Sequence, residues 1–176
     1  MKIIYKICMV IELLQLSVNN GYDEYNMLQN IEKSENGFTN EVKGMPFDEY
    51  KQWLKKEDDY SKSQNLPDNW IPQTTFFLNI DGMPVGIGRV RHYSSEYLEQ
   101  NGVGNLGYGI AKPYRGKGYG NILFENLLIK CKLLGYKRIK LFPYINNIST
   151  NKIMLKHGAK LLGTINDEKH IYEIEI

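Results

Sequence analysis

The sequence predicts one α/β domain, with a mixed, mostly antiparallel sheet and helices on both of its faces. An Asp81-Gly82 pair between two β-prone runs is typical of a hairpin, so part of the sheet is expected to be antiparallel. A strand, helix and strand follow one another over residues 106–144, as in a right-handed βαβ crossover with a parallel strand pair. The chain of 176 residues is long enough for one hydrophobic core. We therefore expect a single domain over residues 1–176, in which residues 1–8 form a loose N-terminal extension.

Apolar residues of the N-terminal part recur first at strand spacing and then at helical spacing. A strand is expected over residues 9–17 and a helix over 22–32. Residues 37–44 are expected to be a loop, and a second helix should begin near Pro46, where proline is tolerated at a helix start. Residues 58–73 are polar and contain two prolines, which predicts a long loop.

The second half of the chain alternates β-prone runs with two amphipathic helices, each followed by a glycine that can end it. The elements expected there, in order, are strands over 74–80, 83–90 and 106–111, a helix over 118–134, a strand over 138–144, a helix over 148–157, and strands over 160–164 and 170–174.

Composition excludes several classes of protein. Two cysteines and three scattered histidines provide neither a disulfide framework nor a metal-ligand spacing. No apolar run approaches the length of a membrane span, and no signal peptide is recognised, so we expect a cytoplasmic protein. The net charge of +2 gives no general argument for nucleic acid, but residues 112–140 hold eight basic residues and one acid. This basic segment suits an anionic ligand.

The most informative stretch is residues 112–120, Lys-Pro-Tyr-Arg-Gly-Lys-Gly-Tyr-Gly, which lies between a predicted strand and a predicted helix. Glycine permits positive φ and close approach of a ligand, so successive N–H groups can converge on one anion. The positive end of the helix dipole adds to this attraction. The residues themselves leave two interpretations open, a phosphate-binding loop and a glycine-rich turn with solvated cations.

Together, these features resemble the GNAT superfamily of N-acetyltransferases. Arg115-x-x-Gly118-x-Gly120 after the strand Leu-Gly-Tyr-Gly-Ile is similar to that family's acyl-CoA signature, and Asn147 followed by a helix that ends at Gly158 is similar to a later segment. The likeness covers roughly residues 73–164 and includes the order of the elements.

The resemblance implies acetyl-CoA as a co-substrate and no metal. The strand at residue 108 would pair with the pantetheine arm in a slot between two splayed strands, and the glycine loop would hold the pyrophosphate. Asn147 would contact the arm or the acetyl end, cap the following helix, or do both. The cofactor-binding residues implied in this way are Tyr108, Gly109, Ile110, Arg115, Gly116, Lys117, Gly118, Tyr119, Gly120 and Asn147.

The chain departs from the family pattern at two catalytic positions. Many relatives carry a Glu where this chain has Asn105, and a Tyr where it has Met154. A general base and acid must then come from elsewhere or from water. Glu96 and Tyr144 are the candidates carried forward, although a solvated loop residue and a packing residue are the alternatives for them.

The expected function is transfer of an acetyl group to an amine by direct attack in a ternary complex. A small-molecule amine is preferred over a protein lysine or N-terminus, and neither nucleic acid nor membrane is expected as a partner. The oligomeric state is open, a homodimer being one option. The alternative from another class is a CoA-binding sensor or interaction module without turnover. Six acids in the variable segments could give the acceptor site a rim for a cationic amine, and solvated surface charge explains the same residues equally well: Asp48, Glu49, Asp58, Asp59, Glu96 and Glu99.

Overall fold

Two adjacent residues with positive φ, Asp81 at 50° and Gly82 at 80°, turn the chain between β4 (Gln73–Ile80) and β5 (Met83–Arg91). Two such residues in succession are what a two-residue hairpin turn requires, and the two strands pair antiparallel. This confirms the predicted hairpin. It forms the centre of the sheet in the computed structural model, which describes residues 9–176. The expected extension over residues 1–8 lies outside the described residues.

The hairpin is extended on both sides into an antiparallel sheet of four strands. β1 (Ile11–Gln15) pairs with β4, and β6 (Leu106–Ile110) pairs with β5, which gives the order β1-β4-β5-β6. Strand β6 is therefore an edge of this sheet.

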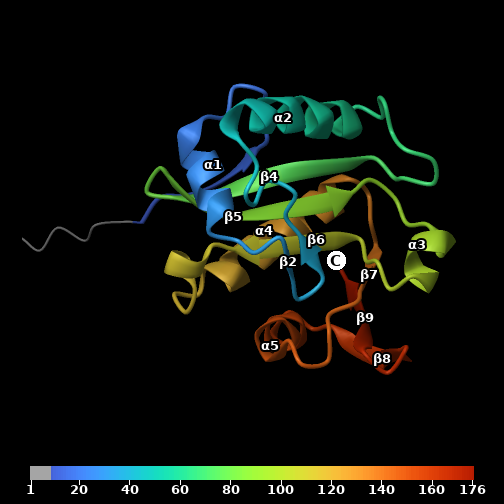
Figure 1. Ribbon diagram of the computed structural model, residues 1–176. Helices are drawn as coiled ribbons and strands as arrows, with labels where there is room; N and C mark the ends of the chain where they lie inside the picture. Colours follow the sequence, from blue (N-terminus) through green and yellow to red (C-terminus); the bar gives the residue numbers. More distant parts are fainter. Residues whose placement is uncertain (1–8) are drawn as a thin grey trace, which may run out of the picture.

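A second sheet of three antiparallel strands has the order β7-β9-β8. It consists of β7 (Arg138–Leu141), β8 (Lys160–Ile165) and β9 (Lys169–Glu175), and α5 (Ile148–Lys156) lies between β7 and β8 in the chain. Figure 1 shows this sheet and α5 below β6.

Helices cover both faces of the four-stranded sheet (Figure 1). α1 (Tyr22–Gln29) and α2 (Phe47–Ser61) pack on one face, in a core that includes Phe77 of β4. α4 (Tyr119–Leu133) packs on the other face, in a core that includes Phe76 and Leu78. Successive side chains of a strand point to opposite faces, so the continuous apolar run of β4 supplies both cores.

Four short elements were not predicted from the sequence. β2 (Ser34–Glu35) and β3 (Phe38–Thr39) form a small hairpin that begins just before the expected loop, and α3 (Glu96–Gln100) lies between β5 and β6. A 3₁₀ turn, η1 (Lys112–Tyr114), precedes the glycine loop. α2 also continues to Ser61, into the segment that was expected to be a loop.

The junction between the two sheets is narrow. The N–H of Asn105 donates to the Lys140 carbonyl at 3.0 Å, and the N–H of Lys140 donates to the side-chain oxygen of Asn105 at 2.7 Å. A Cβ at Gly104 would lie 2.6 Å from that same Lys140 carbonyl oxygen, so only glycine allows this approach.

Beyond this junction, no ladder joins β6 to β7 among residues 9–176. The predicted α/β class, with a mostly antiparallel sheet and helices on both faces, is confirmed, but the predicted central parallel strand pair is not confirmed by any ladder in this part of the chain. The two strands meet at Asn105 and Lys140 and pair no further.

We predict that Gly104→Ala lowers the free energy of unfolding by about 1–3 kcal/mol, because the added methyl group meets a backbone oxygen that cannot rotate away. Gly107→Ala is the matched control, since its Cβ would lie 3.7 Å from the Phe38 ring, an ordinary contact. Chemical denaturation measures both. Equal stability of the two variants would contradict the close approach of the strands at Gly104.

Candidate active site

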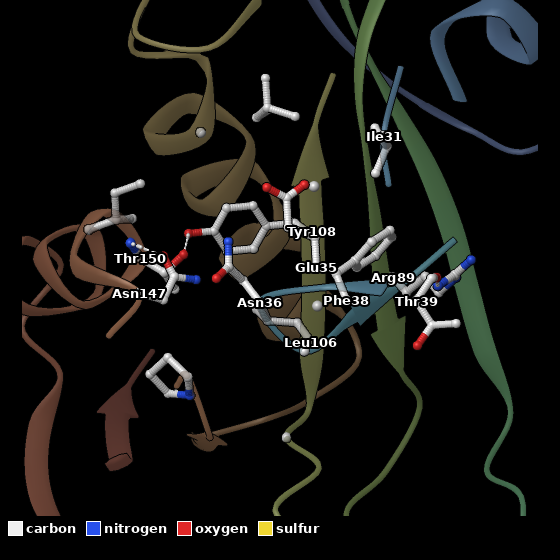
Figure 2. A pocket seen from close by; sticks show the side chains of 18 of the residues that line it. Ile31, Glu35, Asn36, Phe38, Thr39, Arg89, Leu106, Tyr108, Asn147 and Thr150 are labelled. Carbon is white, nitrogen blue, oxygen red and sulfur yellow. Dashed lines mark hydrogen bonds between the residues drawn. The ribbon is translucent and has the colours of Figure 1, made fainter. Parts of the chain in front are cut away.

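A cavity of about 780 Å³ extends across β6. At one end it is lined by the glycine loop and the start of α4, and at the other by Glu57 of α2, Trp70 and Gln73. Figure 2 shows Asn147 and Thr150 on one side of β6, and Phe38 and Arg89 on the other. The cavity lining therefore includes residues from the glycine loop, along β6 and from the opposite end of that strand.

The backbone of β6 presents unpaired groups to the gap beside it. Arg91 donates to the Asn105 carbonyl and Ala111 to the Val85 carbonyl, which sets the alternation of the β5–β6 ladder. In an antiparallel pair every second residue directs its N–H and C=O away from the partner strand. Leu106, Tyr108 and Ile110 are those residues. Apart from the Ile110 carbonyl, which accepts from Arg115 Nε, their outward groups can pair with an extended ligand.

The glycine loop has the geometry of an anion cradle. Gly116 and Gly118 have φ of 75° and 84°, and a Cβ at either would meet no atom within 4 Å, so that space is open to a ligand. Gly118 is the N-cap of α4, whose first turn contains no acid. Among residues 9–176 the N–H groups of Gly116, Lys117 and Gly118 donate to no other backbone group. Free N–H groups at a helix N-terminus attract phosphate.

Arg115 is held across the cavity by an ion pair. Its two terminal nitrogens donate to the two carboxylate oxygens of Glu35, at 2.8 and 2.7 Å, and its Nε donates to the Ile110 carbonyl at 2.8 Å. The hydrogen bonds from Arg115 lower the pKa of Glu35, and the same carboxylate raises the pKa of Arg115. Arg115 therefore ties the β2–β3 hairpin to the glycine loop.

The two glycines of β6 make room for this hairpin. A Cβ at Gly109 would lie 3.3 Å from the Phe38 ring, tighter than an ordinary contact, and one at Gly107 would lie 3.7 Å from it. Phe38 thus packs directly on the strand backbone, and the guanidinium of Arg89 stacks 4.9 Å from the same ring. Figure 2 shows Phe38 between Tyr108 and Arg89.

The α5 side of the cavity carries the polar groups Asn147, Thr150 and Tyr108. The side-chain oxygen of Asn147 caps α5 by accepting from the Thr150 N–H at 3.3 Å, and Asn147 also lines the cavity. The Tyr108 hydroxyl donates to Thr150 Oγ1 at 3.5 Å (Figure 2). Burial raises the pKa of Tyr108 to about 12, so this hydroxyl keeps its proton at neutral pH.

Nine of the ten residues predicted to bind the cofactor line this cavity. These are Tyr108, Gly109, Ile110, Arg115, Gly116, Gly118, Tyr119, Gly120 and Asn147. Lys117 is in the same loop but is not a lining residue; its ammonium lies 5.5 Å from the centre of the Tyr114 ring. The structure therefore brings the predicted cofactor residues together.

The two predicted catalytic residues lie elsewhere. Glu96 is exposed on α3, where it accepts a hydrogen bond from Gln100, and Tyr144 packs against Gly37 and Lys169. Neither lines the cavity, so the structure provides no contact for the proposed roles.

The two departures from the family pattern have structural explanations. Asn105 is 4% exposed, and besides accepting from Lys140 it donates to Ser94 and to the Tyr136 hydroxyl. It holds the strand junction. Met154 is buried in the core beside the cavity.

Each carboxylate that lines the cavity already has a cationic neighbour. Glu35 pairs with Arg115, Glu41 pairs with Lys56, and Glu57 lies near Arg89. The structure gives no support to the acidic rim expected from the sequence, because none of its six members lines the cavity: Asp48, Glu49, Asp58, Asp59, Glu96 and Glu99.

Within the described part of the chain, no helix is both long and apolar enough to cross a membrane. Residues 9–176 also contain no cluster of three or more His, Cys, Asp or Glu side chains placed to hold a metal ion.

The chain was compared with known proteins. The profile of the Acetyltransferase (GNAT) family matches residues 39–159. No curated protein matches the sequence.

Several solved structures share the fold. An acetyltransferase of the GNAT family from Streptococcus pneumoniae is 18% identical, with a TM-score of 0.61 over 95% of this chain and 99% of that one. The microcin C7 self-immunity acetyltransferase MccE, solved with acetyl-CoA and AMP, is 16% identical, with a TM-score of 0.66 over 94% of this chain and 92% of that one. The N-acetyltransferase PseH of Campylobacter jejuni, solved with acetyl-CoA, is 14% identical, with a TM-score of 0.61 over 94% and 99%.

The matched segment contains the β4–β5 hairpin, β6, the glycine loop, α4 and α5. Together these elements line most of the cavity. The chain therefore belongs to the GNAT family of acetyltransferases, enzymes that transfer the acetyl group of acetyl-CoA.

Proposed function

We propose that this enzyme acetylates the amine of a small molecule by direct attack on acetyl-CoA in a ternary complex. The observation that carries the proposal is the open edge of β6, which runs from the strand junction to the glycine loop inside one cavity. An unpaired strand edge suits the amides of a pantetheine arm, and a glycine loop at a helix N-terminus suits a pyrophosphate.

In this proposal each predicted residue acts through a specific group. The backbone of Tyr108 and Ile110 pairs with pantetheine, and Gly109 allows close packing behind it. The N–H groups from Gly116 to Gly120, with Lys117 and Tyr119, surround the pyrophosphate, and Arg115 adds a cation. Asn147 caps α5 with its side-chain oxygen, which leaves its amide nitrogen to contact the arm.

The chemistry requires no covalent enzyme intermediate. An amine with a pKa of about 10 must lose a proton before it attacks the thioester. The N–H of Tyr108 or Ile110 can stabilise the oxyanion of the tetrahedral intermediate, because it points into the gap and is fixed by the strand. The leaving thiolate, with a pKa of about 8.5, needs only one proton to depart as a neutral thiol.

The base and the acid stay predictions. Glu96 is exposed on α3 and does not line the cavity, so it would have to act as a base through water. Tyr144 packs against Gly37, so it would have to move past that residue to donate a proton to the thiolate. Tyr108 lines the cavity, and its hydroxyl donates a hydrogen bond to Thr150 of α5. We add it as a candidate proton donor to the thiolate, because it is buried and protonated.

A small-molecule acceptor is favoured by the elements that line the cavity beyond β6. The β2–β3 hairpin covers the strand from one side, and α2 and Trp70 line the far end. A protein acceptor remains the alternative of the same class, as for the structurally similar ribosomal L7/L12 α-N-protein acetyltransferase RimL. The cytoplasmic location and a homodimer stay predictions from the sequence.

The alternative from another class is a sensor that binds acetyl-CoA without turnover. It is favoured by Asn105 and Met154, which replace residues that could transfer protons. The two functions differ in one assay, release of free thiol from acetyl-CoA over a panel of amines.

We predict that thiol release rises with the concentration of at least one small amine and stops when the amine is omitted. The physical reason is that the thioester needs a nucleophile that only the acceptor supplies. The release is followed with a thiol reagent, and calorimetry measures acetyl-CoA binding in parallel. Saturable acetyl-CoA binding without release for any amine would favour the sensor.

A second prediction concerns the pyrophosphate. Arg115→Ala should weaken CoA binding by about 10-fold or more, because a charge-assisted hydrogen bond is lost, and should leave pantetheine binding unchanged. Glu35→Gln should tighten CoA binding by about 2- to 5-fold at low salt, because a partly exposed ion pair then no longer competes for Arg115. Calorimetry with CoA and pantetheine measures both.

Glu32→Gln is the matched control for the second variant. It removes the same charge three residues earlier in the chain. Glu32 forms an ion pair with Lys112 and does not line the cavity. Equal loss of CoA and pantetheine affinity in Arg115→Ala would argue against contact between Arg115 and the phosphates.

A further inference from the structure

The far end of the cavity, away from the glycine loop, is lined by a cluster of cationic and amide groups that the donor does not use. Arg89 and Arg91 lie two residues apart on β5, so their side chains leave the same face about 7 Å apart. Gln73 pairs in register with Arg91, and Thr75 with Arg89. Gln73, Arg89 and Arg91 all line the cavity, as does Glu57 of α2.

The charges in this cluster do not balance. Glu57, 3% exposed, is the lining carboxylate that lies near Arg89, and it also accepts from the Thr75 hydroxyl at 2.5 Å. Its oxygen lies 3.6 Å from Arg89 Nε, beyond a hydrogen bond. The next lining carboxylate, Glu41, is paired with Lys56. One positive charge therefore lacks a partner at this end of the cavity.

The hydrogen-bond donors of the cluster are also incompletely used. Arg89 donates one hydrogen bond, from a terminal nitrogen to the Thr39 carbonyl at 2.8 Å, whereas its Nε is buried and has no hydrogen-bond partner among the described residues. Arg91 donates one hydrogen bond, from a terminal nitrogen to the Gly104 carbonyl at 2.6 Å. The side chain of Gln73 is 4% exposed and makes no hydrogen bond to another residue in the range 9–176. Buried polar groups are normally satisfied, so the unused donors of Arg91 and Gln73, which line the cavity, indicate a missing ligand.

Burial makes the uncompensated charge costly. Desolvation, and then repulsion from Arg89, lower the pKa of Arg91 to about 10. The group stays charged at neutral pH, but its charged form is disfavoured. A bound anion would offset both effects, and the planar guanidinium fork matches a carboxylate or a phosphate.

The position of the cluster relates it to the acceptor. Arg89 pairs in register with Gly107, and the N–H of Arg91 donates to the Asn105 carbonyl, so both lie at the junction end of β6. The pyrophosphate cradle follows the other end of the strand. An extended donor arm therefore places its thioester between the two. A group that reaches the arginines must come from the acceptor, and Trp70, partly exposed, lines the cavity beside them.

We propose that the acceptor is an amine that also carries an anionic group, a carboxylate or a phosphate, bound by Arg91, Arg89 and Gln73 beyond the thioester. The inference rests on the proposed acetyl transfer and specifies its substrate class. The anion orients the acceptor so that its amine points along β6 toward the donor. It also replaces the cationic acceptor that the acidic residues of the sequence suggested.

The test is binding of matched amines to the CoA-saturated enzyme, which requires no turnover. The probes are amino acids against their carboxamides, and O-phosphoethanolamine against ethanolamine. Calorimetry should show at least 10-fold tighter binding of the anionic member in one of the two sets, and the set that responds distinguishes carboxylate from phosphate. Arg91→Gln should remove that preference, and Arg91→Lys should restore part of it.

Arg138→Gln is the control for loss of one positive charge, because Arg138 is exposed at the start of β7, outside the cavity. It should keep the full preference. CoA affinity and the melting temperature of Arg91→Gln are measured in parallel, because Arg91 also donates to the Gly104 carbonyl. Retained CoA binding separates loss of the anion site from loss of the fold.

Two results would overturn the proposal: no preference for the anionic member in either set, including no binding at all, or equal weakening of both members by Arg91→Gln. Thiol release is measured separately with the same amines. Anion-selective binding without thiol release would refute the transferase and keep the anion site. Thiol release with neutral amines alone would support the transferase and refute the anion site.

Discussion

The structure depends on one junction, where Asn105 of the chain entering β6 exchanges hydrogen bonds with Lys140 of β7. Gly104 lets the two backbones touch there, and beyond it no ladder joins the strands within the described residues. The unpaired edge of β6 would be an aggregation hazard in an ordinary sheet. Here it lines the cavity, with the glycine loop at one end and the arginines of β5 at the other. Asn105, which stands where many relatives carry a Glu, thus has a structural role: its hydrogen bonds to Lys140 hold the strand junction.

The two ends of the cavity manage charge differently. At the glycine loop, Arg115 is neutralised by Glu35 from the β2–β3 hairpin, so a phosphate must compete with a carboxylate that is already in place. At the far end, Glu57 lies near Arg89, and no carboxylate among the described residues forms an ion pair with Arg91. The difference indicates that Glu35 can be replaced by a phosphate at the glycine loop, and that an anion is missing at the far end. The β2–β3 hairpin contacts the site twice, through Glu35 and through Phe38.

The sequence predicted those features that depend on local pattern. Asp81-Gly82 specifies its hairpin by backbone conformation, and the glycine loop is recognisable because positive φ at Gly116 and Gly118 requires glycine. The acceptor end was not predicted, because Gln73, Arg89 and Arg91 become neighbours only through strand register, and each alone resembles a solvated strand residue. The acidic rim failed for the same reason, since charge along the chain does not say which face a helix presents. The β2–β3 hairpin was missed because two-residue strands carry no periodicity.

The central claim is that the outward backbone groups of β6 are the docking edge for the donor. Residue-resolved amide hydrogen exchange, with and without CoA, tests it directly. The N–H groups of Tyr108 and Ile110 face the gap and should exchange rapidly in the free protein, then become protected on binding. Those of Gly107 and Gly109, directed toward β5, should be protected in both states. Unchanged exchange at Tyr108 and Ile110 in the CoA-saturated protein would contradict the claim.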